Sequence, residues 1–243
     1  MPLEQSEGFI LRTHNIGEQD KIVLLFSRDK GLFKGVAKGA RKFGNRFGSS
    51  LEPLSHVRLF YYEKEGRELV TINNSDLLES FFDIQKDLKT TYTLSYFAEL
   101  IEAFFPARSK DEVLFRLLQS TLFSLQSGAN LDFTSLYFEA WFLKISGILP
   151  DFKYCKKCRK NFDETHWLSY KKDGILCGGC ASEKKIEVPV DLNVFLRWIK
   201  KNPPPKDSSA PFSPELLLSI RKILRSIVVY HMERVPKSLR FIE

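Results

Sequence analysis

All four cysteines of this 243-residue chain lie in one short segment, as the pairs Cys155/Cys158 and Cys177/Cys180. Residues 159–176, 18 positions, separate the two Cys-x-x-Cys pairs, and this spacing is typical of a zinc ribbon or a pair of zinc knuckles. Two residues between cysteines let one tight turn direct both thiolates at the same ion. Four thiolates complete a tetrahedral shell and leave no position for water. The segment therefore predicts one structural Zn²⁺ in an element at about residues 151–184.

Other chemistries fit these cysteines less well. Disulfide-capable pairs or four reduced thiols stay open as alternatives, and the spacing does not favour a rubredoxin-like iron site. A thioredoxin-type redox pair belongs in a βαβ context, which the pattern lacks. Gly178 and Gly179 lie between the cysteines of the second pair and are available for the positive φ that a metal-binding turn can require. His166 lies between the pairs, and we interpret it as an ordinary loop histidine because four thiolates already satisfy the metal.

The first 80 residues have the pattern of a small β-barrel. Five short runs are rich in β-branched and aromatic residues and are bounded by turn residues. They are Glu7–His14, Asp20–Ser27, Gly31–Lys38, His56–Glu63 and Arg67–Asn73. Five short strands without long helices favour a closed or half-closed barrel, because closure removes exposed sheet edges. An SH3-like barrel has much the same pattern.

From about Ser75 onward the pattern is helical. Asp76 and Glu79 resemble a capping box and predict a helix start there. Apolar residues at helical spacing predict further helices over about residues 88–104, 113–125, 136–145, 192–199 and 214–236. Ser213 as the N-cap and Pro214 at the first helical position mark the last of these. We expect these stripes to form the core of a helical domain.

The positive charge is concentrated between Lys30 and Leu51. That stretch holds six basic residues and no acidic residue, and Phe33, Phe43 and Phe47 and several glycines lie among them. Open barrels hold single strands in this way, with cations along the phosphates and rings stacked on bases. We take five residues as candidate phosphate contacts: Lys34, Lys38, Arg41, Lys42 and Arg46. The alternative is a solvated basic loop that protects a sheet edge.

The whole chain carries 37 Lys plus Arg against 30 Asp plus Glu, a formal charge of +7. The last helix and tail are also basic, and could extend a nucleic-acid surface, receive an acidic peptide or form an ordinary solvated face. No P-loop, GxGxxG or HExxH motif is present, so the sequence contains no positive sign of catalysis. No apolar run approaches the ~18 residues of a membrane span, and we expect an intracellular protein.

The order of these features resembles the RecO family of recombination mediators. Four barrel motifs carry the resemblance: Gly8-Phe9-Ile10-Leu11-Arg12, Gly17-Glu18-Gln19-Asp20, Lys38-Gly39-Ala40-Arg41-Lys42 and Leu51-Glu52-Pro53-Leu54. The run from Leu149 through Cys158 carries it in the second half, and the resemblance covers essentially the whole chain. It implies an N-terminal OB-fold and a helical C-terminal domain, with Zn²⁺ where four cysteines are present.

The resemblance also implies what the protein does. It implies binding of single- and double-stranded DNA, annealing of complementary strands, and cooperation with RecR in loading RecA onto strands coated by single-strand-binding protein. The acidic, apolar C-terminal tail of that coating protein is a further implied partner, for which a basic-rimmed apolar groove in the helical domain is expected. The implied setting is DNA repair in the bacterial cytoplasm, in association with the nucleoid.

We therefore predict an α+β multi-domain protein. A five-stranded OB-fold barrel at 1–80 binds nucleic acid, and an all-α helical domain at 81–243 contains the inserted four-cysteine zinc element at 151–184. The predicted function is non-catalytic DNA binding and strand handling in recombinational repair. The alternative is a zinc-containing OB-fold protein that binds RNA, because such a barrel serves RNA equally well. A metal-assisted hydrolase would need an open metal or a carboxylate cluster near the basic loop, and the sequence shows neither.

Overall fold

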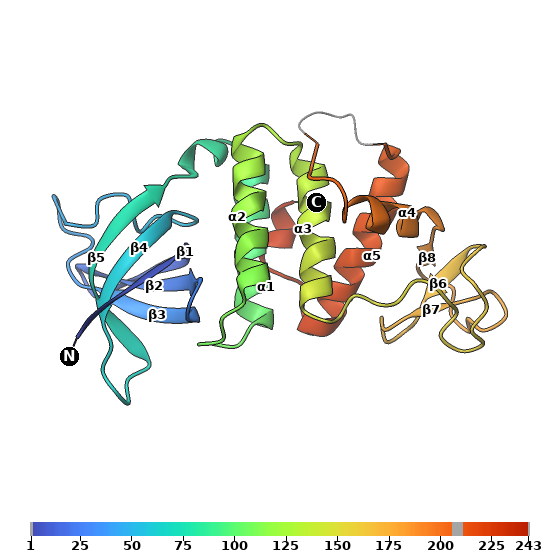
Figure 1. The fold of residues 1–243 in the computed structure, drawn as a ribbon, viewed down its shortest axis with the longest axis horizontal. Coiled ribbons are helices and arrows are strands. Elements are labelled where there is room, and N and C mark those ends of the chain that lie inside the picture. Colours follow the sequence, from blue (N-terminus) through green and yellow to red (C-terminus); the bar gives the residue numbers. More distant parts are fainter. Residues whose placement is uncertain (1, 206–210, 243) are drawn as a thin grey trace. The chain divides into compact units, whose positions relative to one another are not determined.

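The computed structural model describes residues 2–205 and 211–242 (Figure 1). The chain divides into two compact units, Met1–Gln119 with Lys237–Glu243, and Ser120–Pro236. The predicted boundary at about residue 80 marks the change from strands to helices. The two compact units instead divide after Gln119 and after Pro236. The domain boundary near residue 80 therefore remains a prediction.

The first unit begins with a closed five-stranded barrel. Its strands are β1 (Leu3–Ile16), β2 (Asp20–Ser27), β3 (Gly31–Ala37), β4 (His56–Tyr62) and β5 (Leu69–Glu79). Around the barrel the order is β1-β2-β3-β5-β4, and β4 pairs with β1 to close it. Only the β3–β5 pairing is parallel among these five strands. This arrangement confirms the predicted OB-like barrel.

One long strand, β1, makes the closure possible. Its first half pairs with β4, from Leu3 opposite Tyr62, and its second half pairs with β2, as far as Ile16 opposite Asp20. The register shifts between Ile10 and Arg12, and the N–H of Ile10 donates to Ser55 O at 3.0 Å. A bulge of this kind bends a strand and increases its twist. β1 is also longer than the predicted strand Glu7–His14, which it exceeds at both ends.

The predicted helix start at Asp76 and Glu79 is wrong. Both residues belong to β5, where Asp76 lies opposite Arg58 and Leu77 opposite Val57 in the antiparallel pairing with β4. Pairing with a partner strand overrides a weak local capping signal, because it satisfies the backbone of the whole segment. Only a short 3₁₀ turn, η1 (Phe82–Ile84), follows before the first α-helix.

The stretch between β3 and β4 caps the barrel. Its side chains Ala40, Phe47 and Leu51 are buried in the same core cluster as Ile10 and Val23 of the strands. Turn hydrogen bonds hold its backbone, among them Lys42 N to Gly39 O at 3.0 Å and Ser50 N to Phe47 O at 3.0 Å. The glycine-rich segment is therefore a folded cap, although so many glycines are typical of a flexible loop.

The main helices are those expected from the apolar stripes. They are α1 (Leu88–Phe104), α2 (Glu112–Gln126), α3 (Leu131–Ile145), α4 (Asp191–Trp198) and α5 (Pro214–Met232). Side chains of Asp87, Asn130 and Ser213 accept hydrogen bonds from backbone N–H groups in the first turns of α1, α3 and α5. These are ordinary N-caps, which supply acceptors for N–H groups that have no partner within the helix.

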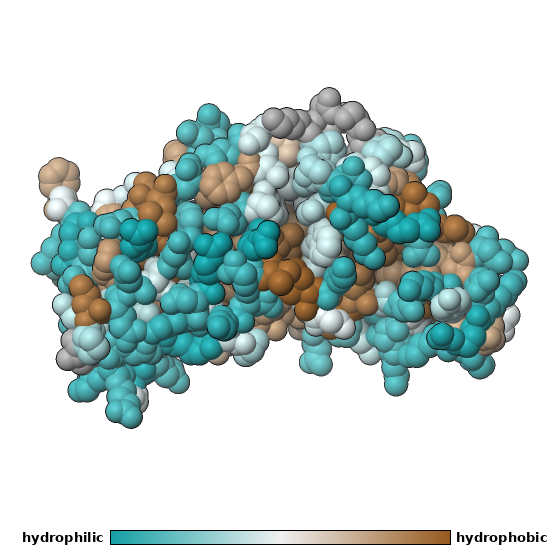
Figure 2. All heavy atoms as spheres, in the orientation of Figure 1, coloured by the Kyte–Doolittle hydropathy of each residue, from teal (hydrophilic) through white to brown (hydrophobic). Residues whose placement is uncertain are grey.

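The second unit contains a small sheet as well as helices. Strands β6 (His166–Leu168), β7 (Ile175–Leu176) and β8 (Glu187–Val188) form it in the order β7-β6-β8. In Figure 2 the visible surfaces of the barrel and of this sheet region are mainly hydrophilic, with apolar residues in small separate groups. Within the described ranges, none of the helices has the length and hydropathy needed to cross a membrane.

Candidate metal centre and nucleic-acid interface

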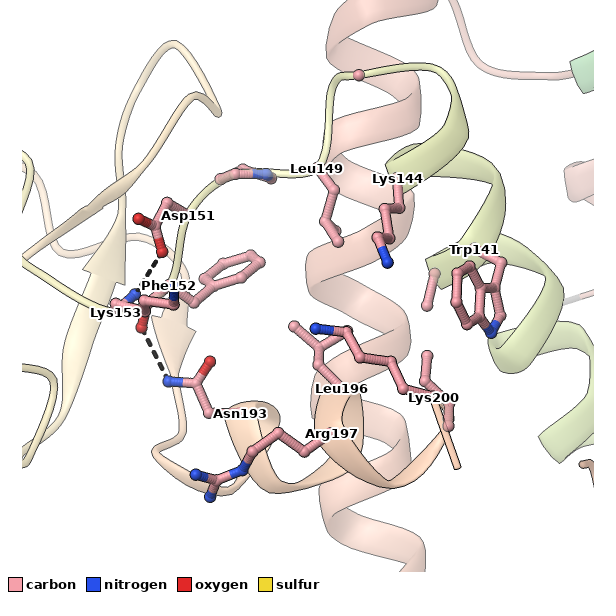
Figure 3. Close-up of a pocket in the computed structure, with 14 residues that line it drawn as sticks. Trp141, Lys144, Leu149, Asp151, Phe152, Lys153, Asn193, Leu196, Arg197 and Lys200 are labelled. Carbon is pink, nitrogen blue, oxygen red and sulfur yellow. Dashed lines mark hydrogen bonds between the residues drawn. The ribbon is translucent and has the colours of Figure 1, made fainter. Parts of the chain in front are cut away.

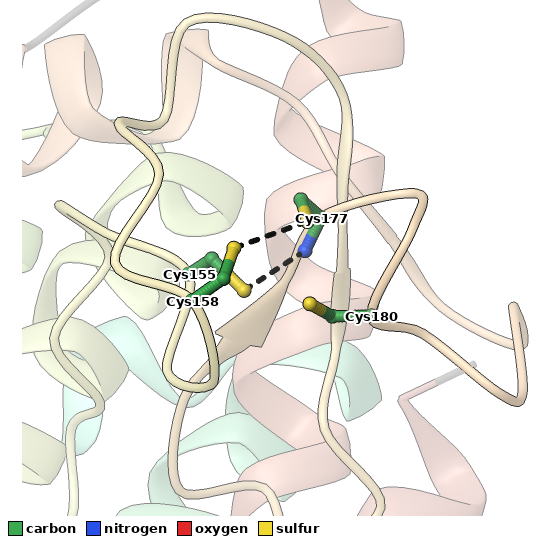
Figure 4. Close-up of side chains that lie close together, drawn as sticks. All are labelled: Cys155, Cys158, Cys177 and Cys180. Atoms are coloured by element: carbon green, nitrogen blue, oxygen red, sulfur yellow. Dashed lines mark hydrogen bonds between the residues drawn. The ribbon is translucent and has the colours of Figure 1, made fainter.

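The four cysteines converge on one point (Figure 4). Their sulfur atoms all lie within 4.8 Å of one another, and the Sγ atoms of Cys158 and Cys177 are 3.6 Å apart. A tetrahedral Zn²⁺ with Zn–S bonds of about 2.3 Å needs sulfurs ~3.8 Å apart. The cluster therefore has the dimensions of a four-thiolate metal site, and these side chains could bind a metal ion.

Tight turns and short strands bring the two pairs together. The N–H of Arg159 donates to Cys155 O at 2.9 Å, and the N–H of Cys180 donates to Cys177 O at 2.9 Å. Between the first and last cysteines, positive φ falls on Arg159, at 64°, and Lys172, at 57°, and not on Gly178 or Gly179 as the sequence suggested. A Cβ at Gly178 would lie 3.4 Å from the Trp167 ring, an ordinary contact distance, so the indole packs against the backbone of the second pair.

The sulfurs differ in how readily they ionise. Burial opposes ionisation of Cys155, but backbone N–H groups that donate to its sulfur, including that of Cys177 at 3.4 Å, lower the pKa of this thiol to about 6. Hydrogen bonds with the sulfurs of Cys158 and Cys177 raise the pKa of the Cys180 thiol to about 12. Because thiolates are the metal ligands, binding of a cation would displace the protons that remain on these thiols.

His166 is not part of the four-sulfur cluster. It is fully buried in strand β6, where its Nδ1 lies 2.8 Å from Glu164 O and its ring packs edge-on against Phe162. The interpretation as an ordinary histidine agrees with this position. The placement in a loop was wrong, because β6 pairs with β7 and β8 on either side.

The structure separates the five candidate phosphate contacts into two places. Lys38, Lys42 and Arg46 line one cavity of about 440 Å³ on the barrel cap, together with Asp20. Arg41 is exposed beside them and donates from Nη1 to Gly17 O at 3.2 Å. Lys34 lies apart in the middle of β3, where it lines a different cavity with Leu24 and Leu69.

Two cations between Lys30 and Leu51 contact different kinds of groups in the barrel. Arg46 donates to Asn73 O at 2.5 Å, and its guanidinium lies 4.8 Å from the centre of the Phe47 ring. Lys30 is paired with Glu4 and with Glu63, and its charge is largely neutralised there. These pairs raise the pKa of the Lys30 ammonium in spite of partial burial. Lys30 is therefore a structural cation of the barrel.

The three aromatic residues of the stretch have different roles. Phe33 and Phe47 are 3 % exposed and belong to the barrel core, so neither can stack on a base. Phe43 is fully exposed and lines the same cavity as Lys38 and Lys42. Of the three rings, Phe43 alone is available to a ligand.

The basic helix α5 is more constrained than its sequence suggests. Arg225 is 9 % exposed and its Nε lies 3.4 Å from a carboxylate oxygen of Glu139, which is fully buried. Arg221 donates to both the carboxylate and the backbone oxygen of Asp132. Two of the basic residues therefore hold α5 against α3 and are not free for an anionic partner.

The second unit contains a groove whose position the sequence did not predict. A cavity of about 330 Å³ lies between α3, the segment after it and α4 (Figure 3). We call it the α3–α4 groove, and define it by Trp141, Lys144, Leu149, Phe152, Leu196, Arg197 and Lys200. The hydrogen bond from Asn193 Nδ2 to Phe152 O, at 2.9 Å, ties the segment to α4.

The groove combines an apolar floor with a basic rim. Leu149, Phe152 and Leu196 face its interior, and the amino groups of Lys144 and Lys200 point toward it (Figure 3). The Lys144 ammonium lies 4.4 Å from the centre of the Trp141 ring. Asp151 also lines the groove, but its carboxylate accepts the N–H of Lys153 at 3.0 Å. Such a site fits a short peptide that carries both apolar and acidic side chains.

Family comparisons cover nearly the whole chain. The N-terminal model of recombination protein O matches residues 1–81, and the C-terminal model of recombination protein O matches residues 85–240. The chain belongs to the RecO family. The predicted resemblance to RecO is therefore confirmed.

Full-length relatives agree with this assignment. The chain is 32 % identical over 232 residues to the DNA repair protein RecO of Koribacter versatilis, covering 96 % of this chain and 95 % of that protein. It is 26 % identical to the DNA repair protein RecO of Caldicellulosiruptor saccharolyticus, over 99 % of this chain and 98 % of the relative. The Dehalococcoides mccartyi protein of the same name is 28 % identical over 98 % of this chain and 94 % of its own length. These RecO relatives indicate a DNA repair protein.

Proposed function

We propose that this RecO-family chain is a non-catalytic DNA-binding mediator of recombinational repair. The observation that carries the proposal is the barrel cap, where Lys38, Lys42 and Arg46 surround one cavity beside the fully exposed ring of Phe43. Cations that contact phosphates and a ring that stacks on bases are the two parts of a single-strand site on an OB-fold. Arg41 and Lys34 would contact further phosphates.

The mediator role would consist of binding alone. Following the RecO resemblance, the chain would anneal complementary strands and act with RecR to load RecA onto DNA coated by single-strand-binding protein. We assign the cysteine cluster one Zn²⁺, because four sulfurs at this spacing form the closed shell that Zn²⁺ prefers in structural sites. With every position filled by a thiolate, the ion would stabilise the fold and would not activate water. The setting would be the bacterial cytoplasm and nucleoid.

The α3–α4 groove is our candidate for the tail of single-strand-binding protein. That tail is acidic and apolar, and the groove offers Leu149, Phe152 and Leu196 below the cations Lys144, Arg197 and Lys200. Apolar side chains of the tail would fill the floor while its carboxylates meet the rim. Fluorescence titration of the tail peptide against the full chain tests this. Leu196→Asp should abolish binding, and Lys144→Gln with Lys200→Gln should make it weaker and less dependent on salt.

A zinc-containing protein that binds RNA is the second candidate. The barrel cap favours neither nucleic acid, because phosphates and unpaired bases are common to DNA and RNA. Competition between DNA and RNA strands of matched sequence separates the two functions. Preference for RNA, together with failure to retain RecR, would reject the mediator proposal.

RecA assembly supplies the direct functional test. Assembly on strands already coated by single-strand-binding protein should be faster when this chain and RecR are both present. Assembly on bare strands should gain much less, because no coating protein has to be displaced there. Equal acceleration on both substrates, or none on either, would contradict the mediator role.

A further inference from the structure

The hairpin beside the second cysteine pair exposes an aromatic ring among cations. Tyr170 lies in the turn between β6 and β7, and its side chain is 75 % exposed. The turn is well defined, because Ser169 N donates to Gly174 O at 2.9 Å and Lys172 N donates to Ser169 O at 3.0 Å. The turn therefore presents the Tyr170 ring to solvent, where it is available to a stacking partner.

Several cations lie close to this ring. β8 runs antiparallel to β6, with Trp167 opposite Glu187 and Leu168 N donating to Ile186 O at 2.9 Å, so Lys185 and Lys184 follow on the side of Ser169 and Tyr170. The Lys184 ammonium lies 4.7 Å from the centre of the Trp167 ring, on the strand that leads into the turn. We call this surface the Tyr170 patch, and define it by Trp167, Tyr170, Lys172, Lys184 and Lys185.

Nearby acids balance only part of the charge of the patch. Burial and the nearby Lys185 lower the pKa of the Lys172 ammonium, so these two cations repel each other. Among nearby acids, Glu183 pairs with Lys185 at 2.8 Å, and Glu187 lies opposite Trp167 on β8. The carboxylate of Asp173 is engaged by Lys156 and by Ser169 Oγ. An external anion between the lysines would relieve their repulsion.

We infer that the Tyr170 patch is a second binding site for single-stranded DNA, in which one base stacks on Tyr170 and the adjacent phosphates contact Lys172, Lys184 and Lys185. The inference rests on the proposed DNA-binding function and adds a contact outside the OB-fold. Trp167 would act as a positioning residue, because its ring lies against Gly178 on one side and holds the Lys184 ammonium. The cysteine cluster would thereby set the shape of the site.

Stacking makes the site selective for single strands. A base within a duplex is already stacked and paired, whereas an unpaired base offers a free face to a ring. Replacement of Tyr170 should therefore weaken binding to single strands and leave duplex binding nearly unchanged. Contacts from the lysines alone would affect both forms, because both present phosphates.

The test uses the full chain and fluorescence-anisotropy titration with oligothymidine and with a duplex. Tyr170→Ala should weaken single-strand binding by about 5- to 150-fold, the range measured for loss of one stacked base, and Tyr170→Phe should bind like the wild type. Phe82→Ala is the matched control: its ring is 72 % exposed but stands beside Asp83, so DNA binding should not change. Metal content and melting temperature of each variant identify any loss caused by unfolding.

Photocrosslinking places the contact independently of affinity. A single strand containing 5-iodouracil should crosslink to a peptide that includes Tyr170, and Tyr170→Ala should remove this product. Lys184→Gln with Lys185→Gln should flatten the salt dependence of single-strand affinity by about 1.4 units, at ~0.7 for each phosphate contact.

The outcomes separate this inference from the proposed function. Wild-type affinity in Tyr170→Ala, with weaker binding when Arg41, Lys42 and Arg46 are replaced, would overturn the Tyr170 patch and leave the barrel site intact. Unchanged DNA affinity with reduced retention of RecR would make the patch a protein-docking surface and also reject the inference. Failure of the wild type to bind DNA would reject the proposed function itself.

Discussion

The carboxylate of Glu99 and the side chain of Ser238 are hydrogen-bonded inside the first compact unit, although 139 positions separate them in the chain. Ser238 donates to Glu99 Oε2 from its hydroxyl at 2.7 Å and from its N–H at 3.2 Å, and the N–H of Lys237 donates to Oε1 at 3.0 Å. Glu99 lies in α1, and Phe241 stacks on Tyr92 of that helix with ring centres 4.4 Å apart. One buried carboxylate thus begins the 3₁₀ turn η2 (Ser238–Phe241) and holds the end of the chain on α1.

Replacing Glu99 should therefore release the end of the chain. Glu99→Ala leaves buried N–H groups without an acceptor, and we expect the free energy of unfolding to fall by about 1–3 kcal/mol. Urea unfolding measures this loss, and faster amide exchange at Lys237 and Ser238 localises it. Glu102→Ala, on the same helix, removes a half-exposed ion pair with Arg12 and should cost less than about 1 kcal/mol. Equal losses in the two variants would contradict the anchoring role.

Elemental analysis of the purified chain should find about one Zn²⁺ per molecule, held by four thiolates. Cys155→Ser and Cys177→Ser should each lower the metal content and the melting temperature, because the ion cross-links the two pairs. DNA binding by the barrel cap should persist in both variants at temperatures where they stay folded. A metal-free wild type whose melting temperature does not respond to added zinc or to a chelator would disprove the site.

The barrel cap should dominate the salt dependence of DNA binding. Replacing Arg41, Lys42 and Arg46 together by Gln removes three charges but keeps side-chain length, which matters because Arg46 covers Phe47. The slope of log affinity against log salt should flatten by about 2 units for single strands, at ~0.7 for each phosphate contact. Lys64→Gln with Arg67→Gln is the control, because these exposed cations stand among Glu63, Glu65 and Glu68. Anisotropy titrations over a salt series measure both variants, and parallel slopes for the triple variant and the wild type would show that the cap is only solvated surface.

Phe43 and Phe47 should respond in opposite ways to the same substitution. Phe47→Ala creates a cavity in the barrel core and should cost about 3–5 kcal/mol of stability. Phe43→Ala removes a fully exposed ring, and should leave stability unchanged while it weakens single-strand binding by about 1–3 kcal/mol. Thermal unfolding and DNA titration of the two variants check both statements. A stability loss in Phe43→Ala would mean that its ring is packed in solution.

Stability of the barrel should decrease in mildly acidic solution because of His56. This side chain is 7 % exposed, stacks on Phe9 with ring centres 4.6 Å apart, and contacts Glu7 at 3.0 Å. Burial lowers its pKa in spite of the nearby Glu7 carboxylate. The unfolded chain therefore binds a proton at a higher pH than the folded chain does, and the free energy of unfolding falls as pH drops below about 6.5. Urea unfolding from about pH 7.5 to 5.5 measures the slope, which should be smaller in His56→Gln; an unchanged slope would assign the effect to other groups.

Local sequence was sufficient for the features that depend on neighbouring residues. The N-cap Ser213 and Pro214 predicted the start of α5, and the observed helix begins there. Each Cys-x-x-Cys pair similarly defines its own turn, and the spacing of the pairs anticipated the single four-sulfur cluster. Runs rich in β-branched and aromatic residues, bounded by turn residues, also identified all five barrel strands, because strand preference and turn formation are largely local.

Tertiary contacts decided what the sequence left open or misled us about. Asp76 and Glu79 carry a capping pattern, yet pairing with β4 places them in a strand, because a long ladder of hydrogen bonds outweighs one cap. Phe43 and Phe47 lie four positions apart in the same glycine-rich stretch, and only the closure of the barrel buries one and exposes the other. The α3–α4 groove and the Glu99–Ser238 anchor join residues far apart in the chain. Sequence alone thus determined the five barrel strands, the main helices and the metal-binding spacing, whereas the tertiary structure decided which side chains remain accessible, since accessibility depends on packing between distant segments.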